Sequence, residues 1–191
     1  MTNTIAVWHA EHANFARLLD ILERELDRFH TGRGPNYGLM LDIMFYMTHY
    51  SDLLHHPRED LAFAKLRERD AGAGDTVDEL LRQHQQIKTW GEELAKHLDG
   101  IVNGSILTRE EVEVPGRNYI ANLRNHMRTE EAKVLPLAAK LLSDSDWTSI
   151  NAAIAHIDDP LFGGANLQRY AALRQEIARE SNGDGAAPAA R

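Results

Sequence analysis

The chain has 191 residues, of which 43% are hydrophobic and 26% are charged, so it is neither a disordered nor a fibrous chain, and its length suits one domain. Its formal net charge of -8 disfavours a general nucleic-acid binder, because the net field repels polyanions. It has no cysteine, which excludes disulfides, thiolate zinc sites and a cysteine nucleophile and leaves His and carboxylates as the metal ligands.

Two helices are expected in the first third of the chain. Apolar residues recur at intervals of three and four from Ile5 to Phe29, which predicts an amphipathic helix. A Gly/Pro break at residues 31–35 ends it. From Tyr37 a second helix of about eight turns is expected. Pro57 lies inside this helix and predicts a kink or a break, because proline lacks a backbone donor and crowds the preceding turn.

Two further long helices follow. Residues 71–74, Ala-Gly-Ala-Gly, end the second helix, and Asp75 or Thr76 can cap a third that runs to about residue 101. Thr108 followed by Glu111 has the spacing of a capping box, which predicts the start of a fourth helix. This helix extends to about residue 142, and Pro136 predicts a kink in it.

The C-terminal part indicates two short helices, one from near Asp146 to about residue 158 and one over about 166–180. No segment alternates polar and apolar residues for long enough to form a convincing strand. We therefore expect an all-α fold, an up-down-up-down four-helix bundle over about residues 5–142. Residues 143–180 would form a helical appendage of the same domain, 1–180, and residues 181–191 a disordered tail.

Ten histidines are about twice the number that an ordinary soluble chain of this length carries. Two of them begin the same motif, His55-x-x-x-Glu59 on the second helix and His126-x-x-x-Glu130 on the fourth. Residues four apart lie on one helix face, so each pair can present an imidazole and a carboxylate to one point. Either pair alone is weak evidence, because such a spacing arises about once by chance in a chain of this composition.

The helical register strengthens the argument. With about 100° per residue, each long helix carries one histidine on its apolar side, namely His12, His55, His84 and His126. On the fourth helix, the face of His126 would also carry Tyr119, Asn122, Lys133 and Leu137. Four His and two Glu would thus converge inside the bundle, and burying them is costly unless a metal ion compensates. Imidazole with carboxylate suits iron, and two Glu from opposite helices can bridge two ions.

The sequence resembles the hemerythrin-like family, also called HHE cation-binding domains, over about residues 5–142. The similarity lies in EHANFARLLDILE around His12, HHPRED around His55 and Glu59, RQHQQI around His84, and HMRTEEAKVLPLA around His126 and Glu130. It implies a four-helix bundle with a non-haem di-iron centre, two iron ions joined by an oxo or hydroxo bridge. The implied metal ligands are His12, His55, Glu59, His84, His126 and Glu130. Family members bind dioxygen or, in some branches, handle nitric oxide, peroxide or iron itself.

The chain departs from the oxygen-carrying members, whose third helix has a second His one turn after the first. Here that position is Lys88, which can point to the site or reach solvent. His56 can supply the missing nitrogen. Tyr119 can donate a hydrogen bond to a metal ligand or pack in the core. Ideal α-helical geometry places Tyr50 on the side of its helix opposite His55. Glu131 and Asp60 are expected to face solvent.

These observations predict a di-iron protein that binds or reduces a small ligand: dioxygen, nitric oxide or peroxide. If it turns its ligand over, it is an oxidoreductase acting on peroxide or nitric oxide. The alternative is an iron-responsive or iron-handling module without turnover, which needs the same ligands. The N-terminal segment lacks the build of a signal peptide and no apolar stretch approaches ~20 residues, so we expect a cytoplasmic protein without a membrane or nucleic-acid partner.

Overall fold

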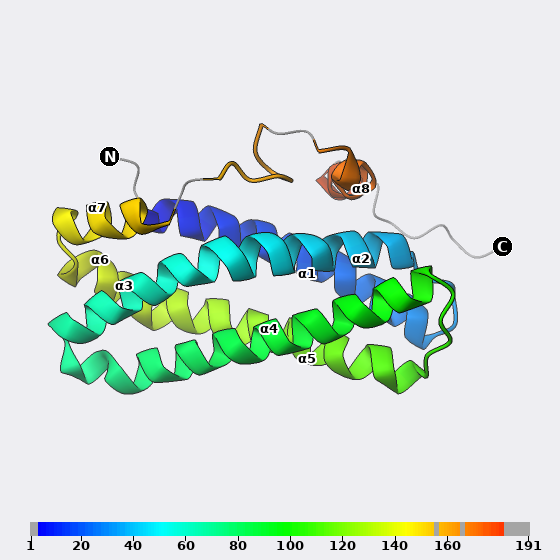
Figure 1. The fold of residues 1–191 in the computed structure, drawn as a ribbon, viewed down its shortest axis with the longest axis horizontal. Helices are drawn as coiled ribbons and strands as arrows, with labels where there is room; N and C mark the ends of the chain where they lie inside the picture. Colours follow the sequence, from blue (N-terminus) through cyan, green and yellow to red (C-terminus); the bar gives the residue numbers. More distant parts are fainter. Residues whose placement is uncertain (1–3, 155–156, 165–166, 182–191) are drawn as a thin grey trace. The chain divides into compact units, whose positions relative to one another are not determined.

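The structure is a computed structural model that describes residues 4–154, 157–164 and 167–181. All regular elements in these residues are helical, as the sequence predicts (Figure 1). The chain divides into two compact units, Met1–Ile157 and Asp158–Arg191, and each is described by itself. None of the helices in the described ranges is long and apolar enough to span a membrane.

Within residues 4–154, the first unit contains four long helical arms and one short α-helix. Two arms are single helices, α1 Thr4–His30 and α4 Gly74–Val102. The other two each consist of three consecutive segments, α2 Tyr37–Tyr46, η1 Met47–His55 and α3 His56–Arg69, and then α5 Arg109–Thr129, η3 Glu130–Val134 and α6 Leu135–Leu141. The 3₁₀ turn η2 Ala71–Ala73 precedes α4, and α7 Asp144–Ala153 follows the fourth arm. The predicted capping box of Thr108 and Glu111 is present at the start of α5.

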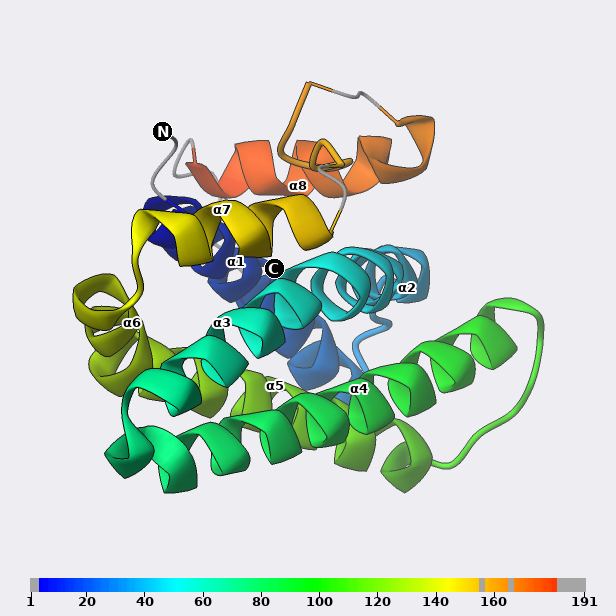
Figure 2. The ribbon, with the colours of Figure 1, turned by 60° about the vertical axis from the view of Figure 1, so that its left-hand side comes forward.

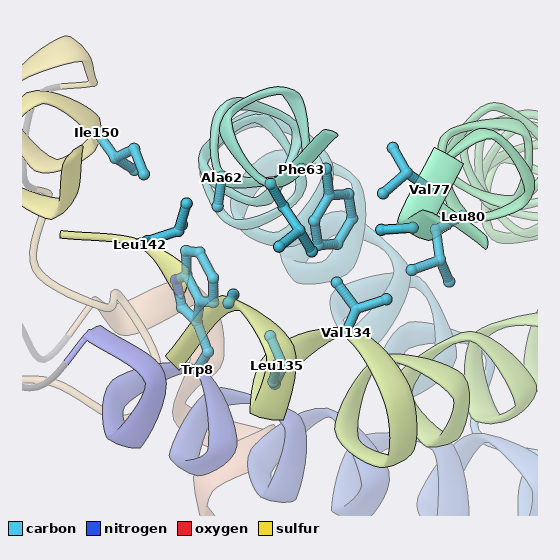
Figure 3. Packing of buried hydrophobic residues seen from close by; sticks show 12 residues of the cluster. Trp8, Ala62, Phe63, Val77, Leu80, Val134, Leu135, Leu142 and Ile150 are labelled. Carbon is cyan, nitrogen blue, oxygen red and sulfur yellow. The ribbon is translucent and has the colours of Figure 1, made fainter. Parts of the chain in front are cut away.

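The four arms enclose one core. α1 packs on α2 and α5, and α4 packs on the same two helices, so each arm has a neighbour on two sides (Figures 1 and 2). At one end of this bundle, side chains from α1, α3, α4, α6 and α7 form a common apolar cluster (Figure 3). Trp8 of α1 lies in it, and its ring stands edge-on to that of His55 at a centroid distance of 6.3 Å.

Prolines alter the second and fourth arms without breaking them. η1 and η3 are π-helical, and each ends within two residues of a proline, Pro57 or Pro136. The backbone N–H groups of His56 and Leu135 reach back five residues, to the carbonyls of Ser51 and Glu130. Proline clashes with the carbonyl four residues earlier, and a wider turn relieves that clash. The expected kinks therefore take the form of π-helical turns within continuous arms.

The π-helical turn also shifts the register of the fourth arm, and here the sequence prediction is partly wrong. Lys133, expected on the face of His126, is exposed, and Leu137 is only half buried. Val134, Leu135 and Ala138 are buried instead. A π-helical turn holds one residue more than the α-helical turn that the prediction assumed, so inward positions after it move along the chain by one.

The two short helices also differ from expectation. α7 begins at Asp144 and ends at Ala153, before the predicted end near residue 158, because Ile154 takes an extended conformation. It packs on α3, where Arg69 donates hydrogen bonds to Asp146. In the second unit the 3₁₀ turn η4 Gln168–Tyr170 leads into α8 Ala171–Ser181. The predicted disordered tail lies outside the described residues, apart from Ser181.

Candidate metal centre

The six residues singled out by the sequence lie together between the four arms. They come from α1, the end of η1, α3, α4, α5 and the start of η3, in the order His12, His55, Glu59, His84, His126 and Glu130. None of them is more than 4% exposed. The centre thus lies inside the first unit, and every arm contributes to it.

The six form two groups of three. His12 Nε2 and His55 Nε2 lie 3.1 Å apart, and Glu59 Oε1 is 3.5 Å from the first and 3.0 Å from the second. Each of these three residues offers one ligand atom, and the three atoms lie within 4.8 Å of one another. This is a compact set of two imidazole nitrogens and one carboxylate oxygen.

The second group repeats this arrangement with His84, His126 and Glu130. The two Nε2 atoms lie 2.9 Å apart. Glu130 Oε1 is 3.1 Å from His126 Nε2 and 3.8 Å from His84 Nε2. Nitrogens from two helices and an oxygen from the helical turn after His126 therefore face one another.

Each carboxylate also reaches the other group. Glu59 Oε2 lies 3.6 Å from His84 Nε2, and Glu130 Oε2 lies 3.5 Å from His12 Nε2. One oxygen of each carboxylate thus faces each imidazole pair. This is the position from which a carboxylate can bridge two metal ions.

The outward nitrogen of each imidazole is held by a polar partner on another helix. The Nδ1 atoms of His12, His55, His84 and His126 lie 3.1, 2.7, 2.7 and 3.2 Å from oxygens of Glu131, Glu11, Asp60 and Gln83, respectively. Such partners fix the tautomer and orientation of a metal-binding histidine. All four rings therefore turn Nε2 toward the centre.

Sequence patterns did not identify Glu11 and Gln83, and they placed Glu131 and Asp60 in solvent. Glu131 and Asp60 are indeed 43% and 42% exposed, yet each accepts a hydrogen bond from a site histidine. Every partner is the immediate sequence neighbour of a site residue: Glu131 follows Glu130, Asp60 follows Glu59, Glu11 precedes His12 and Gln83 precedes His84. Polar residues flanking the predicted ligands were the signal that could have found them.

Tyr50 shows how the π-helix changes the site. Its hydroxyl donates to Glu11 Oε1 at 2.8 Å, while Glu11 Oε2 accepts from His55. Tyr50 and His55 are five residues apart, a separation that lies on opposite sides of an α-helix but near one face of a π-helix. Ideal α-helical geometry therefore misplaced Tyr50. Tyr119 is buried, and its hydroxyl has no hydrogen-bond partner in the described part of the chain.

His56 and Lys88 were the two candidates for an additional ligand. His56 offers an atom that lies within 4.8 Å of those from Glu59, His84 and His126. Its ring stacks on that of His84 with 4.3 Å between centroids, and its Nδ1 lies 3.2 Å from Asp52 Oδ1. Lys88 is 48% exposed, with Nζ 3.9 Å from a Glu92 oxygen. The structure thus places His56 beside the centre and Lys88 at the surface.

The electrostatics of the centre depend on paired charges in a buried space. Burial opposes a charged imidazole at His55, but the carboxylates of Glu59 and Glu11 raise its pKa to about 10. Burial likewise opposes the charge of His84, but Asp60 and Glu59 raise its pKa to about 9. For Glu59 itself, burial is outweighed by the facing imidazoles, and its pKa lies well below the usual range.

Glu59 and Glu130 also raise the pKa of His12 against the effect of burial. Three other groups shift in the opposite sense. Burial and the neighbouring Glu59 charge raise the pKa of Glu130 well above its usual range. Burial and the charge of His84 lower the pKa of His126, and they lower that of His56 to about 3. A cation held here would replace protons as the counter-charge, so binding would release protons.

The carboxylate oxygens provide a test of whether these residues fit a metal. No oxygen of Glu59 or Glu130 accepts a hydrogen bond of good geometry from a described residue, although imidazole nitrogens lie 3.0–3.8 Å away and both side chains are fully buried. Leaving a buried polar group unsatisfied costs roughly 1–3 kcal/mol, and more for a charged one. A cation among the oxygens and the inward nitrogens would offset this cost, so the donor set fits a metal ion.

Comparison with protein families also indicates a cation-binding domain. The family model described as "Hemerythrin HHE cation binding domain" matches residues 3–138, well over half of the chain. This range includes all six site residues and their four outer partners. No curated protein and no solved structure gave a significant match.

Proposed function

Because the chain belongs to the hemerythrin HHE cation-binding domain family, we propose that its centre holds two iron ions joined by an oxo or hydroxo bridge and binds or reduces dioxygen, nitric oxide or peroxide. His12 and His55 would bind one ion and His84 and His126 the other, with Glu59 and Glu130 linking them. The main support for this proposal is that Glu59 and Glu130 each direct one oxygen to each imidazole pair.

The protein's own residues would set the properties of such a centre. Iron supplies electrons to a small bound ligand, and the side chains supply geometry and exclude water. The outer partners Glu11, Asp60, Gln83 and Glu131 would hold the four rings in place. His56 would add a nitrogen on the side of His84 and leave fewer open positions on that ion.

A second function with the same ligands is an iron-responsive or iron-handling module without turnover. The observation that favours it is the burial of all six residues, each at most 4% exposed, because iron would then act as part of the core. If the centre turns its ligand over, the protein is an oxidoreductase that acts on peroxide or nitric oxide. Consumption of peroxide or nitric oxide by the iron-loaded chain distinguishes the two functions.

Iron content tests the two-ion proposal directly. After aerobic reconstitution we expect two irons per chain by elemental analysis and a near-ultraviolet charge-transfer absorption. Glu59→Gln should lower the content to one iron or fewer, because this carboxylate faces both imidazole pairs. The control Glu68→Gln, on the same helix and 66% exposed, should retain two. One iron in the fully reconstituted wild type would contradict the two-ion proposal, and none would contradict an iron centre.

We further propose that the arms follow an up-down-up-down order and that residues 1–180 form one domain with 143–180 as an appendage. The packing of α7 on α3 supports including the segment after the fourth arm. Limited proteolysis tests the extent. Removal of everything after residue 157 with no change in melting temperature would restrict the domain to the first unit.

A further inference from the structure

A surface cavity of about 470 Å³, open to solvent, lies between α1 and the fourth arm. His9, Ala13 and Ala16 line it from α1, and Arg124, Met127 and Arg128 line it from α5. Residues 9, 13 and 16 share one helix face, and the two short alanine side chains on that face leave space where the helices meet. The volume is within the range of about 300–1,000 Å³ that is usual for small-molecule sites.

The outer part of this cavity carries positive charge. The side chain of Arg128 is exposed and makes no ion pair or hydrogen bond within the described ranges of the chain. Arg124, one turn earlier, is held by Asp20 and Glu23 at 2.6 and 2.8 Å. The net charge of -8 disfavours anions over the protein as a whole, so the unpaired Arg128 guanidinium is the group in this cavity that can pair with one.

The cavity also includes one residue of the candidate metal centre. His12, which is 3% exposed, lines the cavity together with Glu131. The Glu131 carboxylate lies 3.1 Å from His12 Nδ1 and 3.4 Å from His9 Nδ1, so it can accept hydrogen bonds from both imidazoles. Ala13, Ala16 and Met127 add apolar surface between this polar end and Arg128.

We propose that this cavity is a binding site for a small organic anion. Its carboxylate pairs with Arg128, and its apolar body lies against Ala13, Ala16 and Met127. The bound anion contacts the Glu131–His12 pair and thus the outer side of one imidazole of the centre. This site goes beyond the proposed function, because it does not depend on which metal the centre holds.

Benzoate is a suitable probe because it combines a carboxylate with a small apolar ring. We would titrate it into the full chain, both metal-free and zinc-loaded, and follow backbone amide signals by nuclear magnetic resonance. We expect saturable shifts confined to residues 9–16 and 124–131, with a Kd of about a millimolar for so small a ligand. Benzylamine, with the same ring but a positive charge, should not bind.

Two pairs of variants test the residues that carry the proposal. Arg128→Ala should weaken benzoate binding about tenfold by removing a charged partner, whereas Arg109→Ala, which removes the same charge elsewhere on α5, should have no effect. Ala13→Leu fills the cavity and should abolish binding, whereas Ala64→Leu, at an exposed site on α3, should not. Melting temperatures verify that each variant is folded.

Three results would overturn the proposal: no saturable shifts, equal binding of benzylamine, or wild-type affinity in folded Arg128→Ala and Ala13→Leu. Failure of zinc to bind would count against the metal centre instead, and the titration of the metal-free chain would still decide on the anion site.

Discussion

At the scale of single residues, each imidazole of the centre turns its Nε2 atom inward, and a polar side chain on its outer side fixes the orientation of the ring. Each outer group belongs to a different helix from the ring that it holds, and it is the sequence neighbour of another site residue. Substituting one outer partner therefore removes a hydrogen bond from an imidazole on another helix. This linkage makes the outer groups the most informative residues to change.

Glu11 is the clearest case, because it joins Tyr50 to His55 and is only 6% exposed. Glu11→Gln keeps the size but weakens the hydrogen bond to His55 Nδ1. We expect a loss of about 10–100-fold in affinity for one metal ion, measured by competition with a chelator for ferrous iron without oxygen. Glu23→Gln, on the same helix, should leave the affinity unchanged. Equal affinities of Glu11→Gln and wild type would show that the ring needs no carboxylate partner.

We expect substitutions at His56 and Lys88 to have different effects on metal retention. His56→Gln keeps a polar side chain beside Asp52 but removes the imidazole near His84, so the metal ion bound by His84 and His126 should dissociate about tenfold more readily. Lys88→Ala should change nothing, because Lys88 is half exposed and directed to Glu92. Metal content after dialysis against a chelator measures both. A loss of metal with Lys88→Ala and none with His56→Gln would reverse this assignment.

At the scale of elements, the close approach of α1 and α5 depends on Gly116. A Cβ at this position would lie 2.8 Å from Leu26 Cδ1, and Leu26 is fully buried. Gly116→Ala should lower the free energy of unfolding by about 1 kcal/mol, because overpacking exceeds the gain in helix propensity. Denaturant unfolding measures this.

The control for this prediction is Gly74→Ala at the first residue of α4, where an added Cβ would have no atom within 4 Å. That variant should be at least as stable as wild type. Equal losses in the two variants would indicate that backbone preference, and not the contact with Leu26, decides the stability at Gly116.

The π-helical segments are the second feature at this scale. Both HxxxE motifs adjoin one: His55 ends η1, and Glu130 begins η3. The wider turn lets residues five apart act together, as Tyr50 and His55 do. Each segment is placed by the proline that follows it, so Pro57 and Pro136 determine the register of the site more than they interrupt the helices.

At the scale of the whole molecule, the centre joins all four arms through groups that repel or remain unsatisfied without a cation. Iron loading should therefore stabilise the fold. A ligand present at about 1,000 times its Kd adds about 4 kcal/mol, which corresponds to a rise of about 10 °C in melting temperature for a chain of this size. Calorimetry of metal-free and iron-loaded protein measures the difference.

The variant Glu59→Gln provides the control for this prediction, because it should lose most of the rise while the metal-free form still folds. Equal melting temperatures of the metal-free and iron-loaded wild type would mean that solvent, and not the cation, compensates the buried charges.

Local sequence patterns were enough to predict several parts of this molecule. The apolar intervals predict the four arms, because a helix that packs on a core must repeat its apolar residues about every 3.6 positions. The capping box at Thr108 and the breaks at 31–35 and 71–74 predict the ends of helices, because caps and Gly/Pro breaks act within a few residues. The spacing of His55, Glu59, His126 and Glu130 predicts two of the inward faces.

Only the tertiary structure decided the remainder. The π-helical turns depend on how the helix relieves the proline clash while its flanking turns stay packed, so ideal α-helical geometry misplaced Tyr50, Lys133 and Leu137. The outer partners Glu11, Asp60, Gln83 and Glu131 each act on a histidine of another helix, and no local pattern contains that contact. The choice of His56 over Lys88 likewise depends on the rotation of α4 against α3, which is a property of packing and not of spacing along the chain.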